Sequence, residues 1–323
     1  MKAVVVNHTG GPEVLELLDK PTPTPGPGQA LIRHEAIGLN FIDIYHRTGL
    51  YPMKAPFTPG SEAAGVVETV GEGVTQVKAG DRVAYAGGQG AYAEMNVVAA
   101  DRLVHVPAEI SFHVAAASML KGMTAEFLAE RVWPALKPGD PVLVHAAAGG
   151  VGGILVQWLK HRGQYVIAAV GGDKKAAIAR NHGADEVLNY DQEDVAARVR
   201  EITAGAGVRV VYDSVGKATF EASLASLGKR GLMVCYGNAS GPAPAIEPGR
   251  LARLGSLFLT RPTLFDYIAT PAELDAAAAT LFGLIGSGVV KIDIGQTWPL
   301  TEVRRAHEAL EGRATTGATV LIP

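Results

Sequence analysis

A short apolar run, a turn rich in glycine and alanine, and a second apolar run follow one another between residues 141 and 158. The first run, Val142–His145, is typical of a buried strand, and the second is typical of a helix that begins near Val151. The spacing Ala147-x-Gly149-x-x-Gly152 between them matches the turn that holds a dinucleotide pyrophosphate, with alanine at the first glycine position. Small residues let a phosphate approach the backbone, and a helix N-terminus offers unpaired N–H groups. The strand before the turn and the helix after it favour nucleotide binding over a purely structural turn.

The composition is that of a globular protein with more than one domain. A chain of 323 residues is long enough for two domains with substantial cores. The net charge of −3 argues against a general nucleic-acid surface, and no apolar run is long enough to span a membrane. The N-terminus turns polar too early for a signal peptide, and the single cysteine, Cys235, agrees with a reducing compartment. We therefore expect a cytoplasmic protein with no nucleic-acid and no membrane partner.

The chain divides into a β-rich part and a part in which strands and helices alternate. Residues 1–120 contain short apolar or alternating runs separated by Gly/Pro turns, which predict strands. Residues 121–265 alternate between strand and helix patterns, which predicts βαβ units and a parallel sheet. The strands expected there are Val142–His145, Tyr165–Val170, Glu186–Asn189, Val208–Asp213 and Gly231–Tyr236. Because residues 266–323 end in a further strand, Ala318–Ile322, we expect them to complete the β-rich domain.

The choice of nucleotide depends on the end of the strand Tyr165–Val170. In NAD sites an Asp or Glu near this point binds the ribose 2′-OH, but here the strand ends in Gly171-Gly172. Lys174 and Lys175 follow, and their charge favours the 2′-phosphate of NADPH. Two alternatives stay open, because Asp173 could partly replace the missing acid or cap the helix, and the lysines could form a solvated helix face.

Motifs along the whole chain together resemble a known family. They are Asn40-Phe-Ile-Asp43, Gly60-Ser-Glu-Ala-Ala-Gly65, Ala79-Gly-Asp-Arg-Val83, His145–Gly152, Val211-Tyr-Asp-Ser-Val-Gly216, Gly231–Asn238, Thr260-Arg-Pro262 and Arg313–Gly317. In this order they resemble the medium-chain dehydrogenase/reductase superfamily and, within it, the zinc-free NADPH:quinone reductases related to zeta-crystallin, especially the bacterial ones. The resemblance implies an α/β fold: a β-rich GroES-like catalytic domain (1–120 and 266–323) and a Rossmann doubly wound parallel-sheet NADPH-binding domain (121–265).

The chain departs from the zinc alcohol dehydrogenases of the same superfamily. Where those enzymes have an early cysteine ligand and the histidine of Gly-His-Glu, this chain has Asn40 and Ser61. A lobe with four cysteines cannot form from one cysteine, and zinc needs three or four N, S or O ligands. We therefore expect no metal site.

Without a metal, hydrogen-bond donors must stabilise the negative charge that reaches the substrate oxygen with the hydride. The resemblance implies that Asn40, Asp43 and Tyr45 lie beside the nicotinamide and that Tyr51 lines the mouth of the site, so these four are the expected catalytic residues. Helix capping is an alternative role for Asn40 and Asp43, and loop anchoring is an alternative for Tyr51.

A larger set is expected to bind the cofactor together with Asn40 and Tyr45. It consists of Thr124 near the nicotinamide, Ala147, Gly149, Gly150 and Val151 at the pyrophosphate, Gly171, Lys175 and Tyr190 at the adenosine phosphate, and Gly237, Asn238 and Ser240 at the nicotinamide ribose or carboxamide. Tyr190 could instead be an ordinary strand-end aromatic, and Ser240 a turn residue. For Arg261 and Arg313 we favour surface ion pairs over a cofactor contact.

These inferences predict NADPH-dependent reduction of a small planar quinone without metal or flavin, by hydride or by single-electron transfer. One alternative is reduction of an activated C=C bond in an enal or enone, with Tyr45 or Tyr51 as proton donor. Another is a non-enzymatic NADPH-binding protein. The family also suggests a homodimer formed through edge strands, for which the apolar run Gly255–Thr260 is the expected edge. A charge at Leu257 should then give monomer or precipitate.

Overall fold

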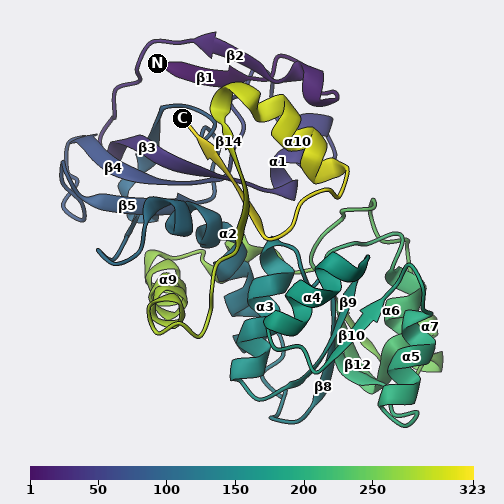
Figure 1. Ribbon diagram of the computed structural model, residues 1–323. Coiled ribbons are helices and arrows are strands. Elements are labelled where there is room, and N and C mark those ends of the chain that lie inside the picture. The colour runs from purple at the N-terminus through teal and green to yellow at the C-terminus, as the bar shows by residue number, and fades with distance from the viewer. The chain divides into compact units, whose positions relative to one another are not determined.

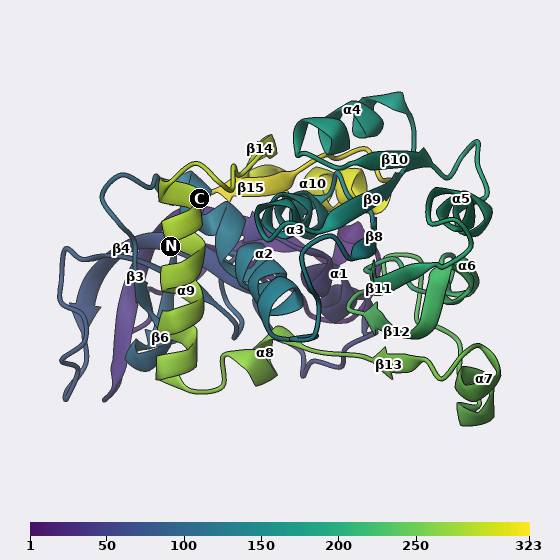
Figure 2. The ribbon, with the colours of Figure 1, turned by 90° about the horizontal axis from the view of Figure 1, so that it is seen from below.

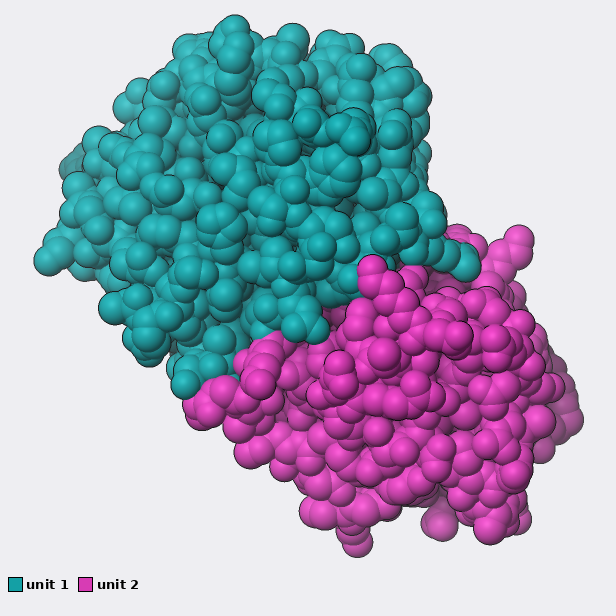
Figure 3. Space-filling view, in the orientation of Figure 1, with its two compact units in different colours: residues 1–123, 268–286, 292–323 teal, residues 124–267, 287–291 magenta.

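The computed structural model describes residues 1–323, and its internal contacts divide the chain into two units (Figures 1 and 3). Unit 1 consists of Met1–Met123, Ile268–Gly286 and Ile292–Pro323, and unit 2 consists of Thr124–Tyr267 and Ser287–Lys291. None of the helices combines the length and the apolar character needed to cross a bilayer. Each unit has its own sheet and its own hydrophobic core.

Unit 1 contains a seven-stranded sheet that is antiparallel except for one pair of strands. Its order is β14 (Ile294–Pro299), β15 (Ala318–Ile322), β3 (Gln29–Leu39), β4 (Glu62–Val70), β5 (Arg82–Ala86) and β7 (Val104–His105), and β6 (Met95–Ala99) also pairs with β3. A separate ribbon joins β1 (Lys2–Val5) and β2 (Glu16–Asp19). The helices of this unit are α1 (Phe41–Thr48), α9 (Pro271–Gly286), α10 (Val303–Glu311) and the first part of α2 (Phe112–Glu130).

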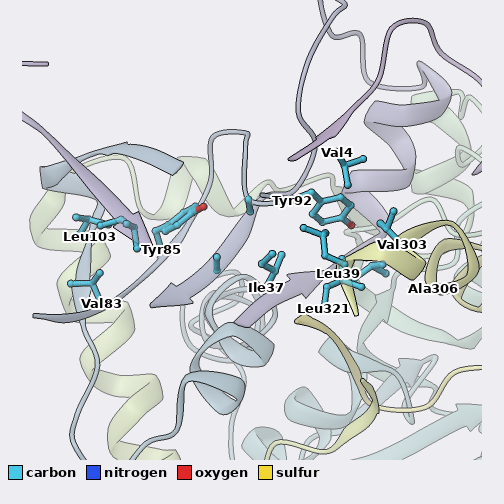
Figure 4. Close-up of a cluster of buried hydrophobic side chains, with 14 of the residues drawn as sticks. Val4, Ile37, Leu39, Val83, Tyr85, Tyr92, Leu103, Val303, Ala306 and Leu321 are labelled. Atoms are coloured by element: carbon cyan, nitrogen blue, oxygen red, sulfur yellow. The ribbon is translucent and has the colours of Figure 1, made fainter. Parts of the chain in front are cut away.

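The core of unit 1 brings together the two ends of the chain. Figure 4 shows Tyr92 between Val4 and Leu39, with Val303 of α10 nearby. These side chains are almost fully withdrawn from solvent. The N-terminal strand and the C-terminal helix are therefore fixed against the segment that carries Tyr92, which matters for the site described below.

Unit 2 is a doubly wound sheet of six parallel strands. Its order is β10 (Glu186–Asn189), β9 (Tyr165–Val170), β8 (Pro141–His145), β11 (Val208–Asp213), β12 (Leu227–Cys235) and β13 (Phe258–Thr260). Helices α3 (Gly150–His161) and α4 (Asp173–Asn181) cover one face, and α5 (Val195–Ile202) and α6 (Phe220–Ser226) cover the other (Figure 2). The strand order reverses between β8 and β11, and ligands bind at the carboxyl ends of such a pair. The expected α/β fold class is confirmed.

Three features differ from the sequence prediction: helix α2, which begins in unit 1 and ends in unit 2, the start of β12, and the burial of Leu257. Helix α2 was not predicted, and β12 begins at Leu227 rather than at Gly231. The expectation for Leu257 is wrong in its premise, because this side chain is only 6 % exposed and belongs to the core of unit 2. The exposed residue of the edge strand is its neighbour Phe258, at 50 %. A charge at Leu257 would therefore disrupt the core rather than an intermolecular surface.

Candidate functional site

The glycine turn of unit 2 leaves the N-terminus of α3 accessible to an anion. Gly149 is the N-cap of α3, and no side chain caps the first turn of the helix. A Cβ atom at Gly152 would lie 2.2 Å from the carbonyl oxygen of Ala146, so glycine is needed for the helix to start this close to the end of β8. Ala147 is buried in the turn, and Gly150 and Val151 are the first two residues of the helix. Unpaired N–H groups and small residues here fit a pyrophosphate.

A second group of the predicted residues lies at the end of β9. A Cβ atom at Gly171 would lie 2.7 Å from the hydroxyl oxygen of Tyr190, so these two residues are brought together. Helix α4 begins directly afterwards, with half-buried Lys175 in its first turn. Exposed Asp173 is the only carboxylate between the end of β9 and Lys175 in the sequence, and the Glu193 carboxylate nearby accepts the N–H of Asn189 at 3.0 Å. The arrangement fits a phosphorylated ribose better than a free 2′-OH, which a carboxylate normally binds.

The loop after β11 is organised by a carboxylate that sequence reasoning did not single out. Asp213 is fully buried and accepts the backbone N–H groups of Val215 at 2.8 Å and Gly216 at 3.0 Å. It also accepts the hydroxyls of Thr219 and Ser223, both at 2.7 Å. Because β11 adjoins β8 at the reversal of strand order, Asp213 fixes one wall of the crevice expected to hold a ligand.

The residues after β12 adjoin this loop. A Cβ atom at Gly237 would lie 2.4 Å from the carbonyl oxygen of Ser214. The Ser240 hydroxyl donates to the carbonyl of Val215 at 2.8 Å and accepts the N–H of Ala218 at 2.9 Å. Its hydroxyl thus holds two loops together, as the turn-residue alternative requires. Cofactor contacts by Gly237, Asn238 and Ser240 stay predictions.

In unit 1, Asn40 and Asp43 form a capping box at the start of α1. Asp43 Oδ2 accepts the backbone N–H of Asn40 at 2.9 Å, which satisfies a donor that the helix itself leaves unpaired. The same carboxylate accepts the hydroxyls of Ser61 at 2.9 Å and Tyr92 at 3.0 Å. Burial raises the pKa of Asp43 to about 6, although the three hydrogen bonds oppose the shift. The structure thus supports the capping alternative, and a direct chemical role for Asp43 stays a prediction.

A buried hydrogen-bond chain continues from Asp43 towards α10. The Tyr92 hydroxyl lies 3.0 Å from His307 Nε2, and Arg47 Nη1 lies 3.2 Å from His307 Nδ1. A guanidinium only donates, so Nδ1 accepts from Arg47 and Nε2 carries the proton that it donates to Tyr92. Burial, followed by the charge of Arg47, lowers the pKa of His307 to about 3, so the ring is neutral at pH 7. Arg47 Nη2 ends the chain with an ion pair to Glu311 at 2.7 Å.

The two candidate tyrosines lie together. Tyr45, buried in α1, packs edge-to-face on Tyr51 with ring centroids 5.1 Å apart. Tyr51 also packs on His46 at 6.1 Å, and its N–H donates to the carbonyl of Tyr45 at 3.0 Å. These contacts support the loop-anchor alternative for Tyr51. A substrate contact by either tyrosine stays a prediction.

The contacts of three other residues considered in the sequence analysis, Thr124, Arg261 and Arg313, say little about cofactor binding. Thr124 is buried in α2 and belongs to unit 2. Arg261 donates to the carbonyl of its neighbour Pro262 at 3.0 Å, and Arg313 has a left-handed backbone with φ of +57°. No group of three or more His, Cys, Asp or Glu side chains is arranged to hold a metal ion.

The sequence prediction did not include six residues of the hydrogen-bonded networks around Asn40 and Asp43: Arg47, Tyr92, His307 and Glu311, together with Glu62, which accepts from Asn40, and Lys121, its ion-pair partner. Glu62 stands inside the quoted motif Gly60–Gly65 and could have been found as the charged neighbour of Ser61, and Lys121 lies three residues before Thr124. Arg47 and His307 are 260 positions apart, so no local pattern connects them.

Comparisons with known proteins agree with this architecture. Residues 26–108 match the model of the alcohol dehydrogenase GroES-like domain, and residues 150–280 match that of the zinc-binding dehydrogenase family. The chain is 52 % identical over 318 residues to a quinone oxidoreductase of Pseudomonas aeruginosa, covering 97 % of both chains. It is 43 % identical to a 2-haloacrylate reductase of a Burkholderia species, covering 99 % of this chain and 98 % of the other.

The chain is also similar to a solved structure. The quinone oxidoreductase of Escherichia coli, complexed with NADPH, superposes with a TM-score of 0.98 at 47 % identity and full coverage of both chains. Similarity of this extent in both sequence and fold covers both units. The chain therefore belongs to the quinone oxidoreductase family of the medium-chain dehydrogenase/reductase superfamily.

Proposed function

We propose that this chain is an NADPH:quinone oxidoreductase that reduces small planar quinones without metal or flavin. The observation that carries the proposal is the 52 % identity, over 97 % of the chain, to a protein named quinone oxidoreductase. The uncapped start of α3 and the space kept by Gly152 support binding of the cofactor pyrophosphate. The single cysteine is the reason to propose a cytoplasmic, reducing setting.

The NADPH would be held by the residues at the carboxyl ends of the unit 2 strands. Gly149, Gly150 and Val151 would bind the pyrophosphate, and Gly171, Lys175 and Tyr190 would bind the adenosine phosphate. Gly237, Asn238 and Ser240 would bind nearer the nicotinamide. When bound, NADPH supplies the reducing equivalents, and hydrogen-bond donors of the protein then stabilise the charge on the reduced quinone oxygen.

Asn40 and the tyrosines of α1 and its loop are the proposed quinone-facing residues of unit 1. A quinone becomes aromatic on reduction, so its oxygen needs only hydrogen-bond donors rather than a strong Lewis acid. The ring pair Tyr45–Tyr51 offers apolar surface for a flat substrate, in addition to two hydroxyl groups. Asp43 would act through the start of α1, since its carboxylate is fully buried and already accepts three hydrogen bonds.

A second candidate is reduction of an activated C=C bond. It is favoured by the 43 % identity to a 2-haloacrylate reductase over nearly the whole chain. This reaction needs a proton donor for the α-carbon, for which Tyr45 or Tyr51 is the proposed group. The two reactions use the same cofactor and differ in the acceptor.

The experiment is an initial-rate measurement of NADPH oxidation against 1,4-benzoquinone, a simple enone and 2-chloroacrylate. Fast turnover with the quinone supports the proposal, and turnover with only the enone or the haloacrylate would replace it by the second candidate. Binding of NADPH without turnover of any acceptor would favour a non-enzymatic role.

We also propose a homodimer formed through β13. This strand pairs with β12 on one side only, and Phe258 on it is 50 % exposed. An apolar edge strand of this kind is a pairing site for a second chain.

A further inference from the structure

A buried ion pair lies directly behind Asn40. Glu62, at the start of β4, is fully buried, and the Lys121 side chain is 6 % exposed. Glu62 Oε1 accepts from Lys121 Nζ at 2.5 Å and from Asn40 Nδ2 at 2.8 Å. Glu62 Oε2 accepts the backbone N–H of Leu120 at 2.6 Å. All four residues belong to unit 1, so the cluster is complete within it.

The backbone is shaped to admit this carboxylate. A Cβ atom at Gly38 would lie 2.2 Å from Glu62 Oε1 and 2.3 Å from the carbonyl oxygen of Ala116. Only glycine at this position allows β3, α2 and the Glu62 side chain to approach one another so closely. The location of the carboxylate is thus determined by three elements of the unit.

Stability does not explain the pair. Removing two charges from water costs several kcal/mol per ion, and well-packed apolar residues of similar size often serve as well or better. Glu62 does, however, control the direction of one amide. An ionised carboxylate only accepts hydrogen bonds, so Asn40 must direct Nδ2 at Glu62 and its carbonyl oxygen the other way. A neutral Glu62 could donate as well, and the amide would then be oriented only by the Asp43 N–H of the capping box and by the Gly38 carbonyl, 3.5 Å from Nδ2.

We infer that Glu62 and Lys121 are positioning residues for the reaction, with Lys121 holding Glu62 in the charged form that fixes the amide orientation of Asn40. The inference rests on the proposed function, in which Asn40 is a quinone-facing residue of unit 1. Lys121 acts here through Glu62 and Asn40, and not by touching the substrate itself.

Other titratable groups near Glu62 must be considered in any test. The carboxylate contributes, after burial, to raising the pKa values of Asp43 and Tyr92, and Lys121 is its only ion-pair partner. Asp43 titrates in the wild type as well, so only a titration that is new in a variant reports on Glu62.

The activity test compares Lys121→Met, Lys121→Arg, Glu62→Gln and the double variant Glu62→Gln/Lys121→Met. Without Lys121 the fully buried carboxylate of Glu62 would have no counter-ion, and burial of an unpaired charge favours the neutral form of a carboxyl group. We expect kcat of Lys121→Met to fall about tenfold at about pH 7 and to recover at about pH 9. Lys121→Arg should stay active at both pH values, and Glu62→Gln should be slow at both. The double variant, which buries no unpaired charge, should fold and be no slower than Glu62→Gln.

The inference would be overturned if the kcat of Lys121→Met equalled that of the wild type. It would also be overturned if this kcat fell by the same factor at every pH and the thermal stability of the variant fell with it. Additive losses in the double variant would overturn it as well, because Lys121 would then act independently of Glu62.

A readout independent of turnover separates this inference from the proposed function. In protein labelled with 15N-asparagine, the NMR signal of the Asn40 side-chain amide reports its hydrogen bond to Glu62. The signal is assigned as the one that is lost in Asn40→Asp. We expect it to shift in Glu62→Gln and to become pH-dependent in Lys121→Met. An inactive wild type with these shifts would reject the proposed function alone, and an active wild type without them would reject the positioning role alone.

Discussion

Tyr92 donates its hydroxyl proton to Asp43 Oδ2 at 3.0 Å and accepts the Nε2 proton of His307 at the same distance. This one hydroxyl therefore joins the start of α1, which carries Asn40, to the C-terminal helix α10. The direction of every bond follows from Arg47, which can only donate to His307. These hydrogen bonds connect the Asp43 carboxylate to the Arg47 guanidinium through the neutral Tyr92 and His307, and Glu311 pairs with Arg47 beyond them.

Replacing Tyr92 by Phe removes a partner from both Asp43 and His307. Each buried group left short of a hydrogen bond costs about 1–3 kcal/mol, so we expect lower stability and a lower kcat. Tyr85→Phe is the matched control, because the Tyr85 hydroxyl is equally buried and lies 3.0 Å from His34 Nε2, outside the Asp43 network. Denaturant unfolding and steady-state kinetics of both variants test this. Equal kinetic effects in the two would show that the Asp43 connection has no influence on the reaction.

Asp43 should make the stability of the protein depend on pH in a particular direction. Its pKa rises from 3.8 to about 6 on folding, so the stability from this group is present below pH 3.8 and is lost as pH rises through about 6. The loss is up to about 3 kcal/mol. The free energy of unfolding, measured for wild type and Asp43→Asn between about pH 4 and pH 7.5, should show this slope in the difference. A difference that does not change with pH contradicts burial as the dominant effect on Asp43.

Lys175 should discriminate between the two nicotinamide cofactors. Lys175→Glu is expected to weaken NADPH binding by at least about tenfold, or ~1.4 kcal/mol, and NADH binding much less. Lys174→Glu is the control, since it makes the same charge change at an exposed neighbouring position. Fluorescence titration with both cofactors measures the four affinities. Equal losses for NADPH and NADH in Lys175→Glu would remove this lysine from the 2′-phosphate site.

The proposed dimer edge is tested at Phe258 rather than at Leu257. Phe258→Asp should give a folded monomer in sedimentation, because the side chain is half exposed on an edge strand. Leu257→Asp should instead unfold unit 2, because it places a charge in the core. Leu18→Asp is the control, because it introduces the same charge at an exposed apolar position of unit 1 and should leave the sedimentation coefficient unchanged. An unchanged sedimentation coefficient for a folded Phe258→Asp would exclude β13 as the interface.

Much of the fold could be predicted from local sequence patterns. The strands Tyr165–Val170, Glu186–Asn189 and Val208–Asp213 were predicted with the bounds that the structure has, because short apolar runs between turn residues are typical of buried parallel strands. Helix α2 was missed, since most of its residues are buried and it therefore lacks the polar stripe that marks a surface helix. The expectation that Leu257 lies on the dimer edge was also wrong. Which side chains of an edge strand are exposed depends on where the strand begins, and β13 begins at Phe258, one residue after Leu257.

The site was predicted less completely than the fold. The glycine turn and the Asn40–Asp43 cap are local patterns, so spacing alone was sufficient to find them. The partners of Asp43 and Asn40 come from distant segments, and only folding brings Tyr92, His307 and Lys121 to them. A single sequence contains no spacing that connects such positions.

The most direct test of the account is a single-turnover experiment. Protein loaded with NADPH is mixed rapidly with 1,4-benzoquinone, and the nicotinamide absorbance is followed under anaerobic conditions. We predict a loss of absorbance at a rate that saturates with quinone concentration, with one quinone reduced for each bound NADPH if a hydride is transferred. Bound NADPH that stays reduced at every quinone concentration would contradict it.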